Sequence, residues 1–406
     1  MATIEAAAAA IPPSMTGAQH RAVWAGFLGW TLDAFDFFLM VFMLKAIAAD
    51  FGVGVKDVSE ALFLTLAARP LGALVFGRLA DRVGRRPVLM GVILAFSALS
   101  ALSGAAQSLG QLLLLRALFG FAMGGEWGLG ASLVMETVPT AMRGRVSGLL
   151  QAGYPAGYLL ASLAYGLLFD AIGWRWMFVL GLVPALLVFF IRMGVAESPV
   201  FLARRHEPPV PGLAALAAHW KRGLYLVILM MAFTTFSHGT QDLYPTFLQH
   251  QHGLSTRVTS AITVMMNIGA ICGALAFGIL SHRLGRQRTI MAAAALAAPA
   301  IPLWAYGAGP GQLALGAVLM QFAVQGAWSM VPAYLNELSP FAIRATFPGV
   351  VYQLGNLLSS RNVVFQADLA ARNGDYGFAL ALVAGVTIAV LIVATAFGPS
   401  PQEDMA

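Results

Sequence analysis

The sequence carries little charge for its length. Only 10% of its 406 residues are Asp, Glu, Lys or Arg, whereas soluble domains usually carry about a quarter. A single cysteine, Cys272, excludes a disulfide scaffold, and 43 glycines without a regular period exclude collagen. Because 59% of the residues are hydrophobic and the mean hydropathy is +0.77, the chain is too apolar to be disordered. Lipid is therefore the predicted solvent for most of the chain.

Twelve stretches are long and apolar enough to cross a bilayer, which takes about 20 residues rising about 1.5 Å each. They cover residues 24–47, 58–80, 87–106, 111–135, 145–169, 175–194, 223–249, 258–280, 289–307, 311–335, 345–367 and 377–397. Lipid cannot satisfy backbone donors, so each stretch is predicted to be a helix, and the fold class is all-α integral membrane. The start, Met1 to Ala18, is interpreted as a short tail rather than a cleavable leader.

Positive charge is distributed unequally between the two sides of these spans. If the N-terminus is cytoplasmic, 16 of the 24 Lys and Arg lie in inner segments and 5 in outer loops. The other three, Arg69, Arg116 and Arg361, fall inside spans. Because cytoplasmic loops carry the excess of Lys and Arg, both termini are predicted to be cytoplasmic in a multi-pass protein of the cell membrane. The net charge of +6 thus reports topology, and no segment builds a basic patch for nucleic acid.

Two motifs recur at an offset of 201 residues. Gly77–Arg86, between the second and third spans, has a less exact copy in Gly278–Gln287. The pattern Glu-x-x-Pro-x-x-x-Arg at 136–143 returns at 337–344. Two recurrences at one offset predict two six-helix halves in parallel repeat.

The predicted halves are residues 1–195 and 223–406. A basic, proline-rich cytoplasmic linker, residues 196–222, joins them. Halves of this kind hold a substrate near the bilayer midplane and rock against each other, so that the site opens alternately to each side.

The segment Gly77–Arg86 resembles the loop 2–3 signature of the major facilitator superfamily, and the layout of two times six spans covers the whole chain. In the first span, Leu32–Phe38 resembles the opening helix of organic-acid:proton symporters, which include sialate and lactate carriers. The resemblance implies the major facilitator fold and a transporter rather than an enzyme.

The seventh span carries a narrower resemblance. Ser237–Thr246 is similar to the signature of the fungal-type lactate/pyruvate:proton symporters (the JEN family), Asn-x-x-Ser/Thr-His-x-Ser/Thr-Gln-Asp-x-x-x-Thr. Every fixed position matches except the first, where Thr234 replaces Asn. Tyr352–Leu357 in the eleventh span is similar to the substrate-helix segment of that family. The resemblance implies lactate and pyruvate as substrates.

Polar side chains form a stripe along the seventh span. Its members recur every four residues: Thr234, His238, Asp242 and Thr246. Ser237 and Gln241 lie on an adjacent stripe. Pro245 cannot donate a hydrogen bond to the carbonyl of Gln241, so a kink is predicted beside the stripe. A broken, polar membrane helix is where a midplane site is expected.

Two groups of residues are candidates for coupling to a proton. A carboxylate whose access to water alternates can load and unload a proton, and a nearby imidazole can share it, which favours Asp242 with His238. A purely structural pair between these two residues is the alternative. Asp33 and Asp36, three residues apart in the first span, are the second candidate, because two like charges so close favour protonation of one.

Arg69 in the second span is the best candidate to bind a substrate carboxylate. Guanidinium stays charged and presents a planar fork that fits a carboxylate, although a structural salt bridge to Asp33 or Asp36 is the alternative. The other predicted substrate contacts are Gln241, Ser237, Tyr244, Gln353 and Asn356. Arg116 and Glu126 in the fourth span flank three glycines and are interpreted as residues with a packing and charge-network role.

Charged residues at the inner ends of spans are predicted to latch the inner side shut. Asp81 is placed to meet the positive end of another helix and neighbouring arginines, of which Arg85 belongs to the same motif. The latch is predicted to have one acid and one base in each half. These are Glu136 with Arg143 in the first half and Glu337 with Arg344 in the second. A role as topology anchors only is the alternative.

The sequence holds no metal-ligand cluster, Walker loop, dinucleotide glycine motif or nucleophile triad. ATP-driven transport is therefore excluded, and no cofactor or metal is predicted. The leading hypothesis is a monomeric, proton-coupled importer of lactate and pyruvate, whose partners are the small carboxylate, the proton and lipid. A larger acid such as sialate or an aromatic acid is the main rival. A non-transporting sensor and a drug:proton exporter are further alternatives.

Overall fold

The computed structural model describes all residues except 1–14, 183–185, 187–189, 192–193, 205–211 and 400–406. Most of the predicted N-terminal tail therefore lies outside the described residues, as do parts of the predicted sixth span and of the predicted linker. Within the described residues every regular element is a helix. The all-α prediction is confirmed.

The N-terminal part of the chain forms long helices. They are α2 (Gly17–Phe51), α3 (Val55–Val83), α4 (Arg85–Gly104), α5 (Leu109–Thr137) and α6 (Arg143–Val179), with short 3-10 turns η1 (Thr140–Met142) and η2 (Leu180–Leu182). Helix α6 spans the boundary between the predicted fifth and sixth spans. It breaks at Gly173, whose φ of 71° is a left-handed conformation that glycine adopts without strain.

The second part of the chain contains several interrupted helices. After α8 (Pro199–Arg204) and α9 (Gly212–Ala218) come α10 (Trp220–Gln241), α11 (Tyr244–His250), α12 (Thr256–Leu284), α13 (Arg286–Ala297), η3 (Ala298–Ala300), α14 (Ile301–Tyr306), α15 (Pro310–Trp328), α16 (Val331–Glu337), η4 (Phe341–Ile343), α17 (Phe347–Ser359), α18 (Asn362–Asn373) and α19 (Tyr376–Ala396). The predicted kink of the seventh span is confirmed, because α10 ends at Gln241 and α11 begins at Tyr244, beside Pro245.

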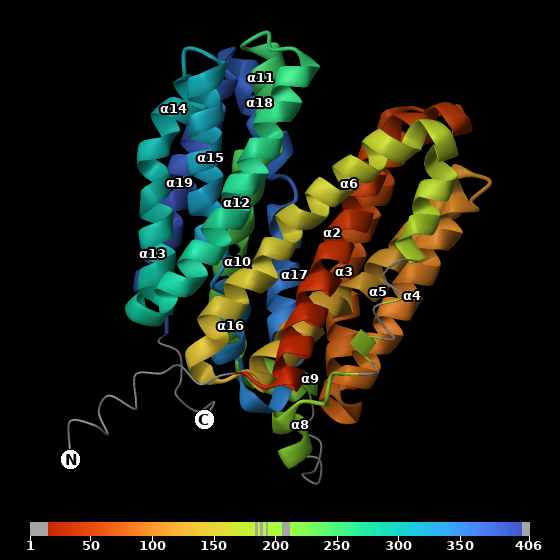
Figure 1. Ribbon diagram of the computed structural model, residues 1–406, viewed down its shortest axis with the longest axis vertical. Coiled ribbons are helices and arrows are strands. Elements are labelled where there is room, and N and C mark those ends of the chain that lie inside the picture. Colours follow the sequence, from red (N-terminus) through yellow and green to blue (C-terminus); the bar gives the residue numbers. More distant parts are fainter. Residues whose placement is uncertain (1–14, 183–185, 187–189, 192–193, 205–211, 400–406) are drawn as a thin grey trace.

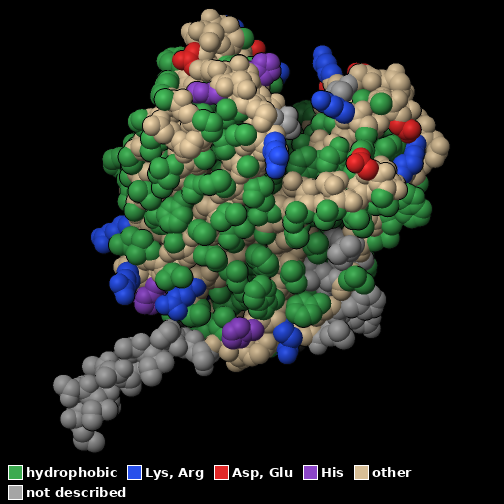
Figure 2. Space-filling model, turned by 45° about the horizontal axis from the view of Figure 1, so that its top comes forward, with side chains coloured by type: hydrophobic (Ala, Val, Ile, Leu, Met, Phe, Trp, Pro, Cys, Tyr) green, Lys and Arg blue, Asp and Glu red, His purple; other side chains and the backbone are tan. Residues whose placement is uncertain are grey.

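Nine helical segments of the described part are long and apolar enough to cross a membrane. The remaining predicted spans correspond to α2, to α17 with α18, and to the sixth span, part of which lies outside the described residues. Figure 2 shows hydrophobic side chains over the middle of the surface, while most visible charges lie nearer the two ends. This is the distribution that a bilayer requires of a helical bundle.

The helices gather into two groups (Figure 1). Helices α2–α5 form one group and α10, α12–α15 and α19 the other, while α6 packs on α12 and α17 packs on α3 between them. Helix α2 begins and α19 ends at the lower side of Figure 1. We call this the inner side, because the distribution of Lys and Arg predicts that it faces the cytoplasm.

Side-chain packing repeats between the groups at the offset of 201 residues. A Cβ added to Gly125 would meet the ring of Phe76, and one added to Gly326 would meet the ring of Phe277. On this basis we propose residues 1–195 and 223–406 as the two halves of the transporter, with 196–222 as the linker.

Candidate functional site

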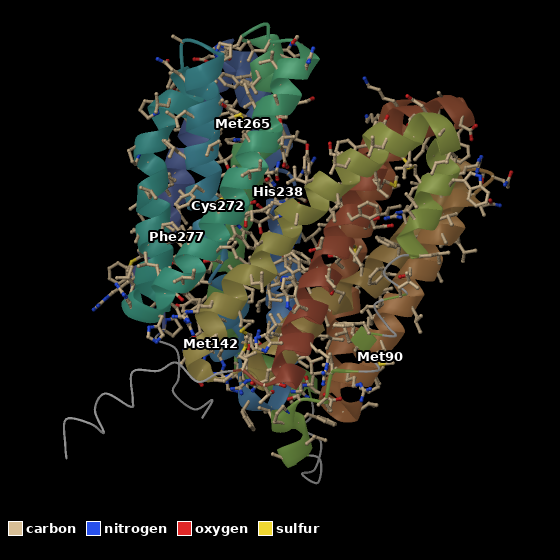
Figure 3. The ribbon with its side chains drawn as sticks, viewed as in Figure 1. Met90, Met142, His238, Met265, Cys272 and Phe277 are labelled. Atoms are coloured by element: carbon tan, nitrogen blue, oxygen red, sulfur yellow. The ribbon has the colours of Figure 1, made fainter. Side chains whose placement is uncertain are left out.

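A cavity of about 490 Å³ lies between the two groups of helices. Its lining includes residues of α2 and α3 from one group, of α10 and α12 from the other, and of α6 and α17 between them. Figure 2 shows a notch between the groups at the side opposite the inner side, and Figure 3 places His238 between them. The cavity is of the size at which proteins bind small organic ligands.

Arg69 lies on α3 in the wall of this cavity and is only 7% exposed. Its guanidinium stands 5.6 Å from the ring centroid of Phe37, and Nη2 donates to the sulfur of Met123 at 2.7 Å. Among the described residues no carboxylate lies within 4.0 Å of the guanidinium, and Nε has no hydrogen-bond partner. A buried guanidinium without a paired anion is suited to receive a carboxylate.

The two aspartates of α2 have different surroundings. Asp33 lines the cavity, is 3% exposed, and its Oδ1 has no hydrogen-bond partner. Asp36 lies outside the cavity, where it pairs with Arg116 at 3.3 Å and accepts a hydrogen bond from Ser100. The structure therefore separates the two residues: Asp33 belongs to the cavity, whereas Asp36 belongs to a buried ion pair within the N-terminal half.

His238 and Asp242 face the cavity together at the end of α10. The imidazole Nδ1 lies 3.1 and 3.3 Å from the two carboxylate oxygens, and the side chains are 35% and 32% exposed. The helix breaks directly after Asp242, which leaves this carboxylate at the C-cap rather than inside a continuous helix. His238 and Asp242 therefore contact each other, and both side chains are accessible to a ligand in the cavity.

The other predicted substrate contacts divide into two sets. Gln241 and Asn356 line the cavity, and Asn356 accepts a hydrogen bond from Thr234 at 2.6 Å. Ser237 and Gln353 are buried outside the lining.

Tyr244 also lies outside the cavity, contrary to its predicted contact with the substrate. Its hydroxyl donates to the carbonyls of Trp304 and Leu313 at 3.1 and 2.9 Å, and its ring stacks on Trp304. The cause is the helix break at Asp242. Because α11 does not continue the polar stripe of α10, Tyr244 does not face the same side as His238.

At the inner side, Asp81 joins the two groups of helices. Its carboxylate accepts hydrogen bonds from the backbone N–H of Ala345 at 3.0 Å and of Thr346 at 3.2 Å, and from the Thr346 hydroxyl at 2.6 Å. Arg85, the first residue of α4, stands 3.5 Å away. The carboxylate therefore caps the segment that leads into α17, where the helix dipole favours negative charge.

The repeated acidic residues have repeated basic partners. Glu136 pairs with Arg85 at 3.2 Å, and Glu337 pairs with Arg286, the residue 201 positions after Arg85, at 2.9 Å. The sequence motifs instead predict Arg143 as the partner of Glu136 and Arg344 as the partner of Glu337. These pairs link the loop 2–3 motif of each half to the acidic motif of the same half, which sequence spacing does not reveal.

Further contacts close the inner side between the halves. Ser132 of α5 donates to the side chain of Asn336 at 2.9 Å, and Ser147 of α6 accepts from the backbone N–H of Ala333 at 3.1 Å. Gly128 faces Gly349 so closely that a Cβ on Gly128 would lie 2.8 Å from the Cα of Gly349. The cavity is closed on this side and open on the other.

A family described as the Major Facilitator Superfamily matches residues 26–360 of the chain. The chain belongs to the major facilitator superfamily. It is a multi-pass membrane protein built for transport rather than an enzyme. The solved structure of the proton:xylose symporter XylE, a member of the superfamily, has the same fold, with a TM-score of 0.70 at 17% identity over 94% of this chain and 96% of that one.

Similar superfamily members are named for organic acids and related compounds. A probable 4-methylmuconolactone transporter of Cupriavidus pinatubonensis is 30% identical, covering 85% of this chain and 82% of its own. The sialic acid transporter NanX of Escherichia coli is 27% identical over 83% and 84%. A carboxylic acid transporter protein homolog of Saccharomyces cerevisiae is 29% identical over 88% of this chain and 62% of its own. The sequence resemblance to the superfamily is confirmed, and its specialisation for lactate and pyruvate stays a prediction.

Several cavity residues of this facilitator were not predicted from the sequence. The wall includes the aromatic residues Trp30 and Tyr154, and polar Thr263 and Asn267 of α12. The last two are four residues apart in an otherwise apolar span, which is the same signal that marked α10. The aromatic residues gave no such signal, because apolar spans hold many aromatic residues that face lipid or core.

Asp81→Asn is expected to loosen the inner side of the facilitator. The change removes charge-assisted hydrogen bonds to Ala345 and Thr346, each worth about 1.5–3 kcal/mol. The inner cleft should then open more often, which a cysteine at Ala131 in a Cys272→Ser background would report through faster labelling by an impermeant thiol reagent. Asp57→Asn is the matched control, since this carboxylate caps the opposite end of α3 within one half. Equal labelling rates in the two variants would contradict the latch.

Proposed function

We propose that this facilitator imports a small organic anion together with a proton. One observation carries the proposal: Arg69 lies buried in the wall of a cavity between the halves, and no carboxylate among the described residues pairs with it within 4.0 Å. A buried charge is costly unless it is paired, so an unpaired guanidinium at this depth needs a functional partner. A substrate carboxylate is the partner that its planar fork fits.

Proton coupling is supported by the acidic groups in the same wall. Asp33 and Asp242 both line the cavity with Arg69 and His238. A bound carboxylate adds one negative charge to this enclosed site, and one accompanying proton restores the charge of the empty site. In our proposal Asp242 carries the proton, His238 shares or tunes it, and Asp33 is the second carrier. Asp36, which pairs with Arg116, has no part in coupling.

Alternation of access is assigned to the inner latch. The Asp81 bonds to Ala345 and Thr346 hold the two halves together while the cavity is open on the other side. The ion pair Arg85–Glu136 joins the start of α4 to the end of α5, and Arg286–Glu337 joins the start of α13 to the end of α16. In our proposal each pair keeps these helix ends together while the halves move. Breaking the Asp81 bonds would let the halves rock apart on the inner side, as the superfamily's parallel halves do.

Lactate and pyruvate are the first proposed substrates, because of the segment Ser237–Thr246. A planar unsaturated or aromatic monocarboxylate is the second candidate, and the shape of the wall favours it. Trp30, Tyr154 and Tyr352 form a connected aromatic surface, with Trp30 stacked on Tyr154 at 5.7 Å between ring centroids. The name of the 4-methylmuconolactone relative supports the second candidate to the same degree as the yeast carboxylic acid relative supports the first.

Competition for binding is expected to rank a polyhydroxy acid last. Sialate carries many hydroxyls, and each one buried without a partner against the aromatic wall costs on the order of 1–3 kcal/mol. Lactate, pyruvate and benzoate should therefore displace a bound labelled acid at lower concentrations than sialate does. The measurement is counterflow of labelled lactate and labelled benzoate in proteoliposomes with each unlabelled acid as competitor. Displacement by sialate at the lowest concentration would replace both candidates with a larger polar acid.

A further inference from the structure

A second, much smaller cavity lies on the inner side of the substrate cavity. Its volume is about 10 Å³, and Trp30 of α2, Glu126 of α5, Gln151 of α6 and Pro332 of α16 are among its lining residues. Trp30 also lines the substrate cavity, so this residue borders both spaces.

Three buried polar atoms around this space have no hydrogen-bond partner in the described part of the chain. They are Nε1 of Trp30, Oε2 of Glu126 and Oε1 of Gln151, on side chains of residues that are 6%, 3% and 2% exposed. One N–H donor and two oxygen acceptors without a hydrogen-bond partner among the described residues thus belong to residues that line a volume of about one water probe. A buried water typically needs roughly that much space and two to four polar partners.

The repeat shows that packing does not need the carboxyl of Glu126. The sequence Gly125-Glu126-Trp127 of α5 corresponds, at 201 residues, to Gly326-Ala327-Trp328 of α15. Both glycines make room for a phenylalanine ring, and both tryptophans pack on Tyr352, at 3.9 and 6.0 Å between ring centroids. The second half achieves the same packing with alanine at the middle position. Packing, one part of the packing and charge-network role that the sequence predicts for Glu126, therefore leaves the carboxyl unexplained.

The small cavity lies where the two halves meet. Most of its lining comes from α2, α5 and α6, whereas Pro332 comes from α16 of the other half. The seal beside it is made by Ser132 with Asn336 and by Gly128 against Gly349. When the halves part on the inner side, the wall formed by Pro332 moves away, and the space around Glu126 joins the cytoplasmic water.

We propose that Glu126 is the group that releases the transported proton to the cytoplasmic side, through a water held between Glu126, Gln151 and Trp30. The proposal rests on proton-coupled transport as proposed above. In the described part of the chain, the charged and titratable groups close enough to Glu126 to interact with it electrostatically are Asp33 of α2, Arg69 of α3 and Tyr352 of α17. While a substrate carboxylate occupies Arg69, the carboxyl of Glu126 stays protonated, because one guanidinium does not balance several buried anions.

The release step conserves the proton that entered on Asp242. When the substrate carboxylate occupies Arg69, the O–H bond of Asp242 breaks and the proton passes through water in the substrate cavity to the carboxylate of Glu126, where a new O–H bond forms. After the substrate leaves Arg69 for the cytoplasm, the O–H bond of the Glu126 carboxyl breaks, and the proton passes to the cavity water and from there to bulk water. The carboxylate that remains is balanced by the vacated Arg69. One proton and one anion have then crossed together, and the empty carrier returns with no net gain of charge.

Infrared difference spectroscopy of the reconstituted protein tests this assignment without any substrate. Raising the pH should remove a carboxylic-acid C=O band in the wild type, and this band should be absent in Glu126→Gln. Gln151→Leu should shift its frequency, since the hydrogen bonding of the carboxyl changes. Gln325→Leu is the matched control, because Gln325 is an equally buried glutamine with an unpartnered Oε1 on α15, and it should leave the band unchanged. Persistence of the full band in Glu126→Gln would overturn the proposal.

Transport gives the second readout. Glu126→Gln should exchange internal for external lactate or benzoate at near wild-type rates and lose at least tenfold in accumulation driven by a pH gradient. Gln151→Leu should lose accumulation in part, and Gln325→Leu should lose none. Wild-type accumulation by Glu126→Gln would contradict the release role while leaving proton-coupled transport intact. A wild-type protein that moves none of the acids would instead contradict the proposed function.

Discussion

Arg69→Lys is expected to weaken binding of the transported acid about 10- to 100-fold without loss of the fold. Lysine keeps the positive charge but presents a single ammonium group, so one of two charge-assisted hydrogen bonds to the carboxylate is lost. Such a bond is worth about 1.5–3 kcal/mol, and about 1.4 kcal/mol is a factor of ten in affinity. Quenching of tryptophan fluorescence by lactate and benzoate in the purified protein is a suitable measurement, because Trp30 lines the same cavity.

The control for this variant is Arg257→Lys. Arg257 is exposed at the start of α12, away from the cavity lining, and its replacement should change neither binding nor thermal stability. Arg69→Lys should also keep its melting temperature, since no carboxylate among the described residues lies within 4.0 Å of the Arg69 guanidinium. Unchanged affinity in Arg69→Lys would remove Arg69 from the carboxylate site. A collapse of stability would instead favour the structural role that was the alternative for this residue.

Asp242→Asn is expected to separate exchange from net uptake. Asparagine mimics the protonated carboxyl permanently, so the loaded carrier can still reorient and exchange internal for external acid at near wild-type rates. The empty carrier can no longer release and reload the proton at this position, and accumulation driven by a pH gradient should fall to the level of liposomes without protein. Both activities are measured in the same proteoliposomes.

Two companion variants sharpen this result. His238→Ala should keep net uptake and shift its pH optimum, because the imidazole, whose Nδ1 lies 3.1 Å from the carboxylate, shares or tunes the proton rather than carrying it. Asp170→Asn is the control, since Asp170 is exposed on α6 and does not line the cavity. Wild-type accumulation by Asp242→Asn would transfer the carrier role to Asp33, the cavity aspartate of α2.

Features governed by local sequence were the ones that could be predicted. Hydrophobic length marks spans because lipid imposes it, and Pro245 breaks the seventh span because its nitrogen cannot donate. The cavity positions of Arg69, Asp242 and His238 follow from polar residues placed where only a cavity or a partner can accept them.

Features governed by the rotation and crossing of helices could not be predicted. Asp33 and Asp36 are one turn apart, yet the packing of α5 gives Arg116 to Asp36 and leaves Asp33 in the cavity. Tyr244 follows the polar stripe in sequence, but the break turns it toward Trp304. Glu136 and Arg85 are 51 positions apart, and their pairing depends on how α4 meets the end of α5.

Proton movement coupled to acid uptake is the most direct test of the central claim. Proteoliposomes with a trapped pH-sensitive dye receive external lactate, pyruvate, benzoate, niacin or sialate, with protein-free liposomes and Arg69→Ala liposomes as references for passive entry of weak acids. The account predicts internal acidification above both references for at least one monocarboxylate, one proton per acid, unchanged when the membrane potential is clamped with valinomycin and potassium. Acid uptake that follows the membrane potential and moves no proton would contradict it.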